Sequence, residues 1–223
     1  MYEAKAESPF EFVSCIEVKE LLGKKALDEA QLLDLLEEVP PDSIFYHTHG
    51  YFLRHRYLTG LYRNDFANWA ALEVGDRVLG EKLGSLDPHQ FGDIEGVRSA
   101  LIDILDAHLS KLDPVPGVTY GEPFHFMQSK IVEVPTQLRA RTLREFRDGM
   151  SKVHVGAIFY HVFEARLRRE MPAGDFRAWI EEELKLPELA EQIGSLDPYM
   201  HSLESLRQRI VSACDEILGR DRI

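Results

Sequence analysis

The sequence has little cysteine and no long apolar run. Its two cysteines, Cys15 and Cys214, stand near opposite ends of the 223 residues and have no paired or metal-ligand spacing. They are therefore predicted to be free thiols, which suits a reducing compartment. No segment approaches the eighteen uninterrupted apolar residues that a membrane span needs, and the first residues carry no basic leader. These absences predict a soluble, cytoplasmic protein.

Positive charge is also in short supply. The formal net charge is −12, which repels phosphate backbones and argues against nucleic-acid or anionic-membrane partners. The charge is uneven, since residues 1–122 carry net −11 and residues 123–223 carry net −1. A protein partner or self-association could use this polarity. A solvated acidic surface that keeps the chain soluble is the interpretation we favour.

Recognisable catalytic signatures are missing as well. The sequence contains no Gly-x-Ser-x-Gly, no glycine-rich phosphate loop and no His-Glu-x-x-His. No cofactor is predicted, and a metal remains only a minor alternative.

A repeat is the strongest feature that is present. Four short motifs occur twice in the same order: Pro9-Phe10-Glu11-Phe12 and Pro123-Phe124-His125-Phe126, Ile44-Phe45-Tyr46-His47 and Ile158-Phe159-Tyr160-His161, Asp65-Phe66 with Trp69 and Asp175-Phe176 with Trp179, and Gly84-Ser85-Leu86-Asp87-Pro88 and Gly194-Ser195-Leu196-Asp197-Pro198. We therefore predict two tandem copies of one helical unit, residues 9–112 and 123–219, joined by a Pro/Gly linker over 113–122. Two copies favour a closed pseudo-twofold arrangement, packed as one globular unit.

Periodicity and capping signals predict a mainly α fold. Helices are expected over residues 28–38, from an Asp42-Ser43 cap through Leu58, and over 93–112 and 202–218. Asp65 and Asp175 are expected to cap the helices that carry the tryptophans, and Gly84 and Gly194 to end helices. The segments Phe10–Val18 and Phe124–Val134, the second closed by Pro135, are expected to be either short strands, forming one two-stranded element, or extended arms.

The motifs resemble a known family. The segments Phe45-Tyr46-His47-Thr48-His49, Asn64-Asp65-Phe66-Ala67-Asn68-Trp69 and Ile158-Phe159-Tyr160-His161 with Glu164-Ala165-Arg166-Leu167-Arg168 resemble a prokaryotic family known only as a domain of unknown function. The resemblance covers nearly the whole chain. It implies no activity and no catalytic residue, only a loose link to carbohydrate-processing or glycosyl-transfer pathways.

The candidate ligand or metal residues are four histidines and one carboxylate: His47, His49, His55, His161 and Glu164. A pseudo-twofold axis could bring His47 and His161 together, and carboxylates could complete a zinc or iron site. The competing interpretation, which we favour, makes His47 and His161 core residues whose ring nitrogens bond neighbouring backbone or Tyr46 and Tyr160.

Arginines give a second candidate site. Arg166, Arg168 and Arg169 could converge on an anionic ligand, although pairing with the acidic first half is the favoured use. Trp69 and Trp179 occupy matched positions and are interpreted as packing anchors rather than sugar platforms.

Two functions follow from these patterns. The leading hypothesis is a non-enzymatic interaction or regulatory module. The alternative is a small-molecule or metal-binding enzyme with its site at the interface of the copies, around His47 and His161.

Overall fold

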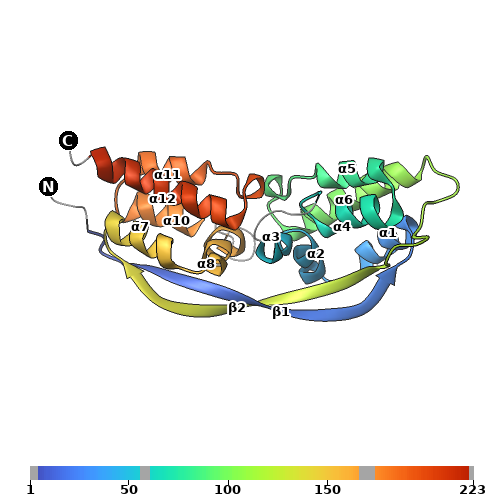
Figure 1. Cartoon of the computed structure of the whole chain (residues 1–223), viewed down its shortest axis with the longest axis horizontal. Coiled ribbons are helices and arrows are strands. Elements are labelled where there is room, and N and C mark those ends of the chain that lie inside the picture. The colour runs from blue at the N-terminus through green and yellow to red at the C-terminus, as the bar shows by residue number, and fades with distance from the viewer. Residues whose placement is uncertain (1–4, 56–60, 166–173, 221–223) are drawn as a thin grey trace. The chain divides into compact units, whose positions relative to one another are not determined.

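The chain is mainly helical and has one two-stranded antiparallel sheet (Figure 1). The computed structural model describes residues 5–55, 61–165 and 174–220. The chain divides into two compact units: unit 1 comprises Met1–Ile16 and Val132–Ile223, and unit 2 comprises Glu17–Ile131. Among the described residues no helix combines the length and the apolar character that crossing a membrane requires.

The sheet pairs β1 (Phe10–Ala26) with β2 (Phe124–Ala140). Both strands are longer than predicted, and the expectation that Pro135 closes the second one is wrong. Pro135 is exposed within β2, where a residue without an N–H group is tolerated because a two-stranded sheet has only edge strands. The boundary between the units falls inside the strands, at Ile16/Glu17 and Ile131/Val132, and not at the linker 113–122.

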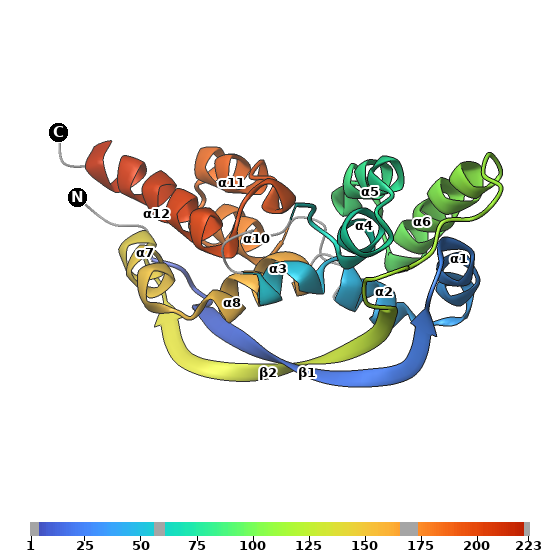
Figure 2. The ribbon, with the colours of Figure 1, turned by 45° about the vertical axis from the view of Figure 1, so that its right-hand side comes forward.

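Unit 2 contains the first set of helices, which lie on one face of its strand segments (Figure 1, Figure 2). They are α1 (Glu29–Glu38), α2 (Pro41–His47), α3 (Gly50–Arg54), α4 (Asp65–Trp69), the π-helical turn η1 (Ala70–Val74), α5 (Arg77–Gly84), the 3-10 turn η2 (Pro88–Gln90) and α6 (Ile94–Leu109). The side chain of Asp28 caps α1 and that of Asp93 caps α6, close to where the sequence places both helix starts. Helix α6 packs against α1, α2 and α5.

The single long helix expected from Asp42 through Leu58 is wrong, because the described part of this segment forms two shorter helices, α2 and α3. Helix α2 begins at Pro41, before the predicted Asp42-Ser43 cap, and no side chain caps it. Its last residue is His47, and Thr48, which follows, has a φ of −110° and a ψ of −82° that are not helical. The Thr48 hydroxyl donates to the Ile44 carbonyl at 2.6 Å, so it satisfies a backbone acceptor at the break. Leu58 lies outside the described residues.

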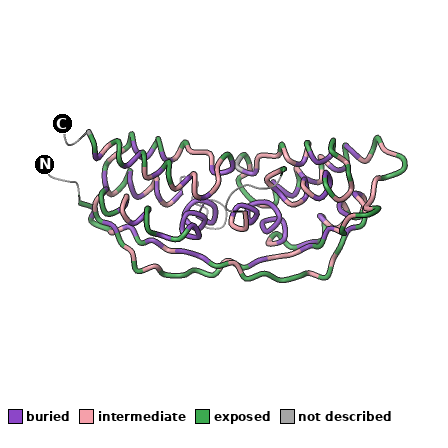
Figure 3. Tube along the Cα trace, viewed as in Figure 1, coloured by how far each residue is buried: buried purple, intermediate pink, exposed green. Residues whose placement is uncertain are grey.

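Unit 1 contains the second set of helices. They are α7 (Leu143–Lys152), α8 (Val155–Phe159), the π-helical turn η3 (Tyr160–Glu164), α10 (Asp175–Glu182), α11 (Pro187–Gly194), the 3-10 turn η4 (Pro198–Met200) and α12 (Leu203–Arg220). Helix α12 packs against α7, α8 and α11. Helices α2 and α8 are buried along most of their length (Figure 3).

The tryptophan helices are not capped as predicted, although the glycine ends are confirmed. Asn64, not Asp65, caps α4 by accepting from the Ala67 N–H at 2.8 Å, and Gly174 precedes α10. Asp65 and Asp175 are the first residues of their helices, which leaves their carboxylates for other partners. Helices α5 and α11 end at Gly84 and Gly194 as expected.

The strand ends supply aromatic rings to both cores. In unit 2, Phe124 stacks on Phe66 with ring centroids 5.0 Å apart, and Phe126 is fully buried. In unit 1, Phe12 stacks on Phe146 at 5.6 Å. Each Phe-x-Phe arm therefore packs among the helices of the other sequence copy, which is why the units differ from residues 9–112 and 123–219.

Candidate functional site

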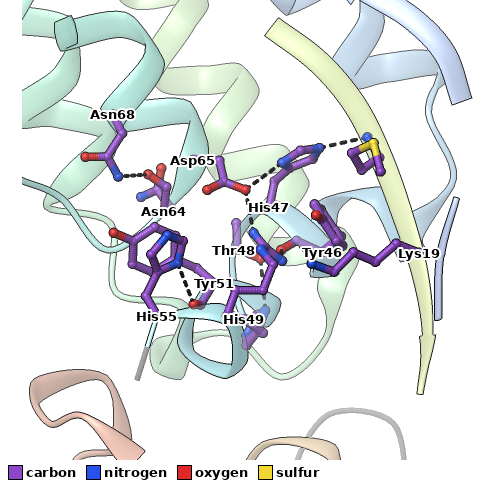
Figure 4. A network of polar contacts seen from close by, with 12 residues as sticks. Lys19, Tyr46, His47, Thr48, His49, Tyr51, His55, Asn64, Asp65 and Asn68 are labelled. Atoms are coloured by element: carbon purple, nitrogen blue, oxygen red, sulfur yellow. Dashed lines mark hydrogen bonds and ion pairs between the residues drawn. The ribbon is translucent and has the colours of Figure 1, made fainter. Parts of the chain in front are cut away.

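His47 is the centre of the best-defined polar cluster in unit 2. It is the last residue of α2, it is 3% exposed, and its ring lies between Asp65 and β2 (Figure 4). Its Nε2 accepts from the Met127 N–H at 3.0 Å, so its Nδ1 carries the proton and donates to Asp65 Oδ2 at 2.8 Å. Both ring nitrogens are thus occupied within the fold.

Arg54 completes this cluster from the end of α3. Its Nη2 donates to Asp65 Oδ2 at 2.6 Å and its Nη1 donates to the Tyr46 carbonyl at 2.7 Å. The guanidinium also lies over the Tyr46 ring, 3.8 Å from the centroid. One carboxylate oxygen of Asp65 therefore accepts from both an imidazole and a guanidinium.

The electrostatics of the cluster favour a neutral imidazole. Burial lowers the pKa of His47, and the Asp65 carboxylate opposes that shift only in part. Burial also raises the pKa of Tyr46. A neutral ring with one donor and one acceptor matches its two bonds, so the cluster holds β2 against α2 without spare protons to transfer.

Unit 1 holds its own strand in the same way. The Val13 N–H donates to His161 Nε2 at 3.0 Å, and His161 Nδ1 donates to Asp175 Oδ2 at 2.6 Å. Phe10 packs on the His161 ring with centroids 4.9 Å apart. His161 is 3% exposed. The chemistry is again that of a buried clamp on a strand.

An open groove of about 400 Å³ lies at the His47 cluster. Its lining includes Tyr46, Arg54, Trp69, Leu72 and Glu122. Trp69 is nearly buried and donates its indole N–H to the Glu122 carbonyl at 2.9 Å, as a packing anchor does. His47, Arg54 and Asp65 are themselves among the lining residues, so the bonded cluster forms part of the wall of the groove.

The remaining histidine candidates have separate surroundings. His49 is buried and stacks on Phe45 at 5.3 Å, and the Thr48 hydroxyl lies 3.0 Å from its Nδ1. His55 stacks on Tyr51 at 3.9 Å and lies 3.0 Å from that residue's carbonyl. The break after α2 explains why His47 and His55 do not share the single helix face that was expected.

The predicted metal residues do not form a ligand group in the described part of the chain. Within residues 5–55, 61–165 and 174–220, no set of three or more His, Cys, Asp or Glu atoms close enough for one ion includes any of the five candidates, His47, His49, His55, His161 and Glu164. Glu164 is buried in η3. The anion candidates Arg166, Arg168 and Arg169 lie outside the described residues.

Sequence reasoning missed the roles of Asp65, Asp175 and Arg54. The signal was available for the aspartates, because both belong to the repeated Asp-Phe…Trp motif. A carboxylate at the start of a helix reads as a cap, however, and the histidines that bind these two lie 18 and 14 residues away in sequence.

Fold and cluster together define a class: a mainly helical protein whose histidine–aspartate pairs hold the strands of a two-stranded sheet. The chain belongs to a family of unknown function (DUF5752), which matches residues 7–215. It is similar to a solved structure titled "The structure of OrfY from Thermoproteus tenax", with a TM-score of 0.79 and 26% identity, covering 96% of this chain and 97% of that one. No curated protein matches the chain.

Proposed function

We propose that this chain is a non-enzymatic interaction and regulatory module that associates through the exposed residues of β1 and β2. A second copy of the chain is the partner that we test first. The observation that carries the proposal is the exposure of aliphatic side chains on both strands, whose fractions are Ile16 56%, Val18 53%, Leu21 58%, Val132 44% and Val134 37%.

Strands of this kind are suited to protein contact. A two-stranded sheet leaves an outer edge on each strand, and exposed N–H and C=O groups on such edges pair readily with an added strand. Aliphatic side chains beside those edges lose water on association, which adds an apolar driving force.

The local charge supports the same surface. The two strands together carry five basic and four acidic side chains, whereas the whole chain has net −12. Like charge on the rest of the surface disfavours contact between copies, whereas the strands lack that repulsion.

The enzyme alternative around His47 and His161 has weaker support. A general base or a metal ligand needs a nitrogen lone pair that is available, and each ring already accepts from a strand N–H and donates to an aspartate. Association makes no such demand on these rings.

The test is the mass of the full chain in solution, measured by sedimentation over a wide range of concentration. We expect an oligomer whose association is weakened by Val18→Ser combined with Leu21→Ser. The matched control is Val78→Ser on α5, where the valine is 59% exposed. The control should associate like the wild type.

Two results would overturn the proposal. One is a wild-type chain that stays monomeric at every concentration and also retains no partner from a soluble lysate. The other is an oligomer that the strand variant and the Val78→Ser control leave equally intact.

A further inference from the structure

Unit 2 contains a second polar cluster, built from the ends of three helices. Glu29 is the first residue of α1, Asp76 caps α5, and His108 lies in the last turn of α6. His108 Nε2 is 2.9 Å from Asp76 Oδ2 and 3.9 Å from Glu29 Oε2. One ligand atom from each of the three residues lies within 4.8 Å of the others.

Glu29 is the unusual member of this cluster. It is fully buried, and neither of its carboxylate oxygens has a hydrogen-bond partner within the described parts of the chain. A buried carboxylate without hydrogen bonds is costly unless a cation or a proton neutralises it. Its side chain lies beside a second carboxylate, that of Asp76, which increases the need for positive charge.

Unit 1 shows what these positions need for folding alone. Leu143 is the first residue of α7, as Glu29 is of α1. Leu186 directly precedes α11, as Asp76 precedes α5. Ile217 follows Ser202, the residue before α12, by the same number of positions as His108 follows Asp93, the residue before α6. Three aliphatic residues thus stand where unit 2 has two acids and a histidine. The helical arrangement itself does not require the polar set.

We propose that Glu29, Asp76 and His108 bind one divalent first-row transition metal, with Zn²⁺ as the representative ion. One imidazole nitrogen and two carboxylates suit such ions and disfavour Mg²⁺, which prefers oxygen ligands alone. The bound ion ties the starts of α1 and α5 to the end of α6. Asp76, whose side chain is 15% exposed, is the member of the set that reaches solvent.

Binding requires two local adjustments. Zinc ligands lie about 2.0–2.2 Å from the ion, so His108 and Asp76 must separate by a few tenths of an ångström to admit it. Lys82 Nζ lies 3.0 Å from His108 Nδ1 and donates to it. This partly exposed lysine must turn away, because a ring that binds metal through Nε2 carries its proton on Nδ1.

The experiment compares zinc binding by the full-length chain with that of matched variants. The filled control combines Glu29→Leu, Asp76→Leu and His108→Ile, the residues that unit 1 has at these positions. Calorimetric titration with ZnCl₂ should show one more bound ion per wild-type chain than per filled control. Zinc should also raise the melting temperature of the wild type only.

Two single variants sharpen the test. Glu29→Gln keeps the size of the side chain and should weaken zinc binding on the order of tenfold or more, because it removes a charged ligand. Lys82→Gln should strengthen binding, because it removes the competing donor to His108.

Equal zinc stoichiometry in the wild type and the filled control would overturn the site and leave a shared proton as the account of the cluster. If Glu29→Gln does not fold, an unchanged zinc affinity in Lys82→Gln overturns the proposed metal site instead. Both outcomes are separate from the proposed association, which depends on β1 and β2 and is measured in chelator.

Discussion

At the scale of single residues, the two clusters of unit 2 use histidine in opposite ways. His47 has one donor and one acceptor bond, both to fixed groups of the fold, and burial keeps the ring neutral. His108 instead lies near two carboxylates, those of Asp76 and Glu29, and the Lys82 ammonium. The first arrangement fixes a strand, and the second is the cluster for which a metal ion is proposed above.

The neutral state of His47 predicts a pH dependence of stability. Its pKa is lowered in the folded chain, whereas an unfolded histidine titrates near 6.5, so below that pH the unfolded state binds more protons. The free energy of unfolding should therefore hold above about pH 7 and fall as the pH drops through about 6.5, by at most ~1.4 kcal/mol per pH unit from this residue.

Urea titrations at several pH values check this prediction through variants. His47→Gln keeps an acceptor for the strand N–H and should show a shallower loss of stability on acidification. The control is His125→Gln, at an exposed histidine on β2. Equal pH dependence in both variants and the wild type would contradict a neutral, buried His47.

Residue identity alone predicted some of these features and not others. The burial of His47 and His161 agrees with the interpretation favoured from the motifs. Their ring partners are strand N–H groups and aspartates, and not the neighbouring Tyr46 and Tyr160. The group of Glu29, Asp76 and His108 was not predicted, since its members are far apart in sequence and follow no motif. Comparing the two copies would have found it, because the counterparts are aliphatic.

At the scale of elements, each Phe-x-Phe arm, Phe10–Phe12 or Phe124–Phe126, packs among the helices that follow the other arm in sequence. Gly149 in the middle of α7 illustrates this, because a Cβ at that position would lie 2.5 Å from Cε2 of Phe12. Phe12 lies near the N-terminus, far from Gly149 in sequence. No local pattern around Gly149 indicates that this ring packs there.

Gly149→Ala should therefore destabilise the chain by about 1–3 kcal/mol, because the methyl group overpacks against a buried ring. Helix propensity alone predicts the opposite sign, a gain of up to ~1 kcal/mol. Gly219→Ala in α12, where a Cβ meets nothing within 4 Å, is the matched control and should be neutral or stabilising. Urea denaturation gives both values.

The double variant Gly149→Ala with Phe12→Leu connects the effect to the arm. A smaller side chain at position 12 should recover part of the loss, so the two changes should not be additive. Additive losses, or a Gly149→Ala variant as stable as Gly219→Ala, would contradict the packing of β1 on α7.

The elements also show where local signals succeed. The helix starts near Asp28 and Asp93 and the terminal glycines Gly84 and Gly194 depend on signals within a few residues, and the structure has these helix ends as predicted. The length of the strands depends on their pairing with each other, between segments distant in sequence. Pro135 lies inside β2 because the strand there has only one partner, which the sequence around the proline does not reveal.

At the scale of the whole chain, the copies predicted from the sequence and the compact units of the structure are different divisions. The copy over residues 9–112 lacks Phe124 and Phe126, the rings that complete the core beside Phe66 and His47. The unit Glu17–Ile131 includes both rings and the Met127 N–H that binds His47.

Two fragments of the chain distinguish these divisions. Residues 17–131 should fold with a cooperative thermal transition, because their aromatic core and their strand clamp are both present. Residues 9–112 should unfold at a much lower temperature or lack a transition, since losing one buried Phe side chain commonly costs about 3–5 kcal/mol and this fragment lacks two. Circular dichroism and amide proton dispersion measure both. If the fragment 9–112 folded as well as 17–131, the arms would be dispensable to the helices they contact, and the repeat boundaries would be the true units of folding.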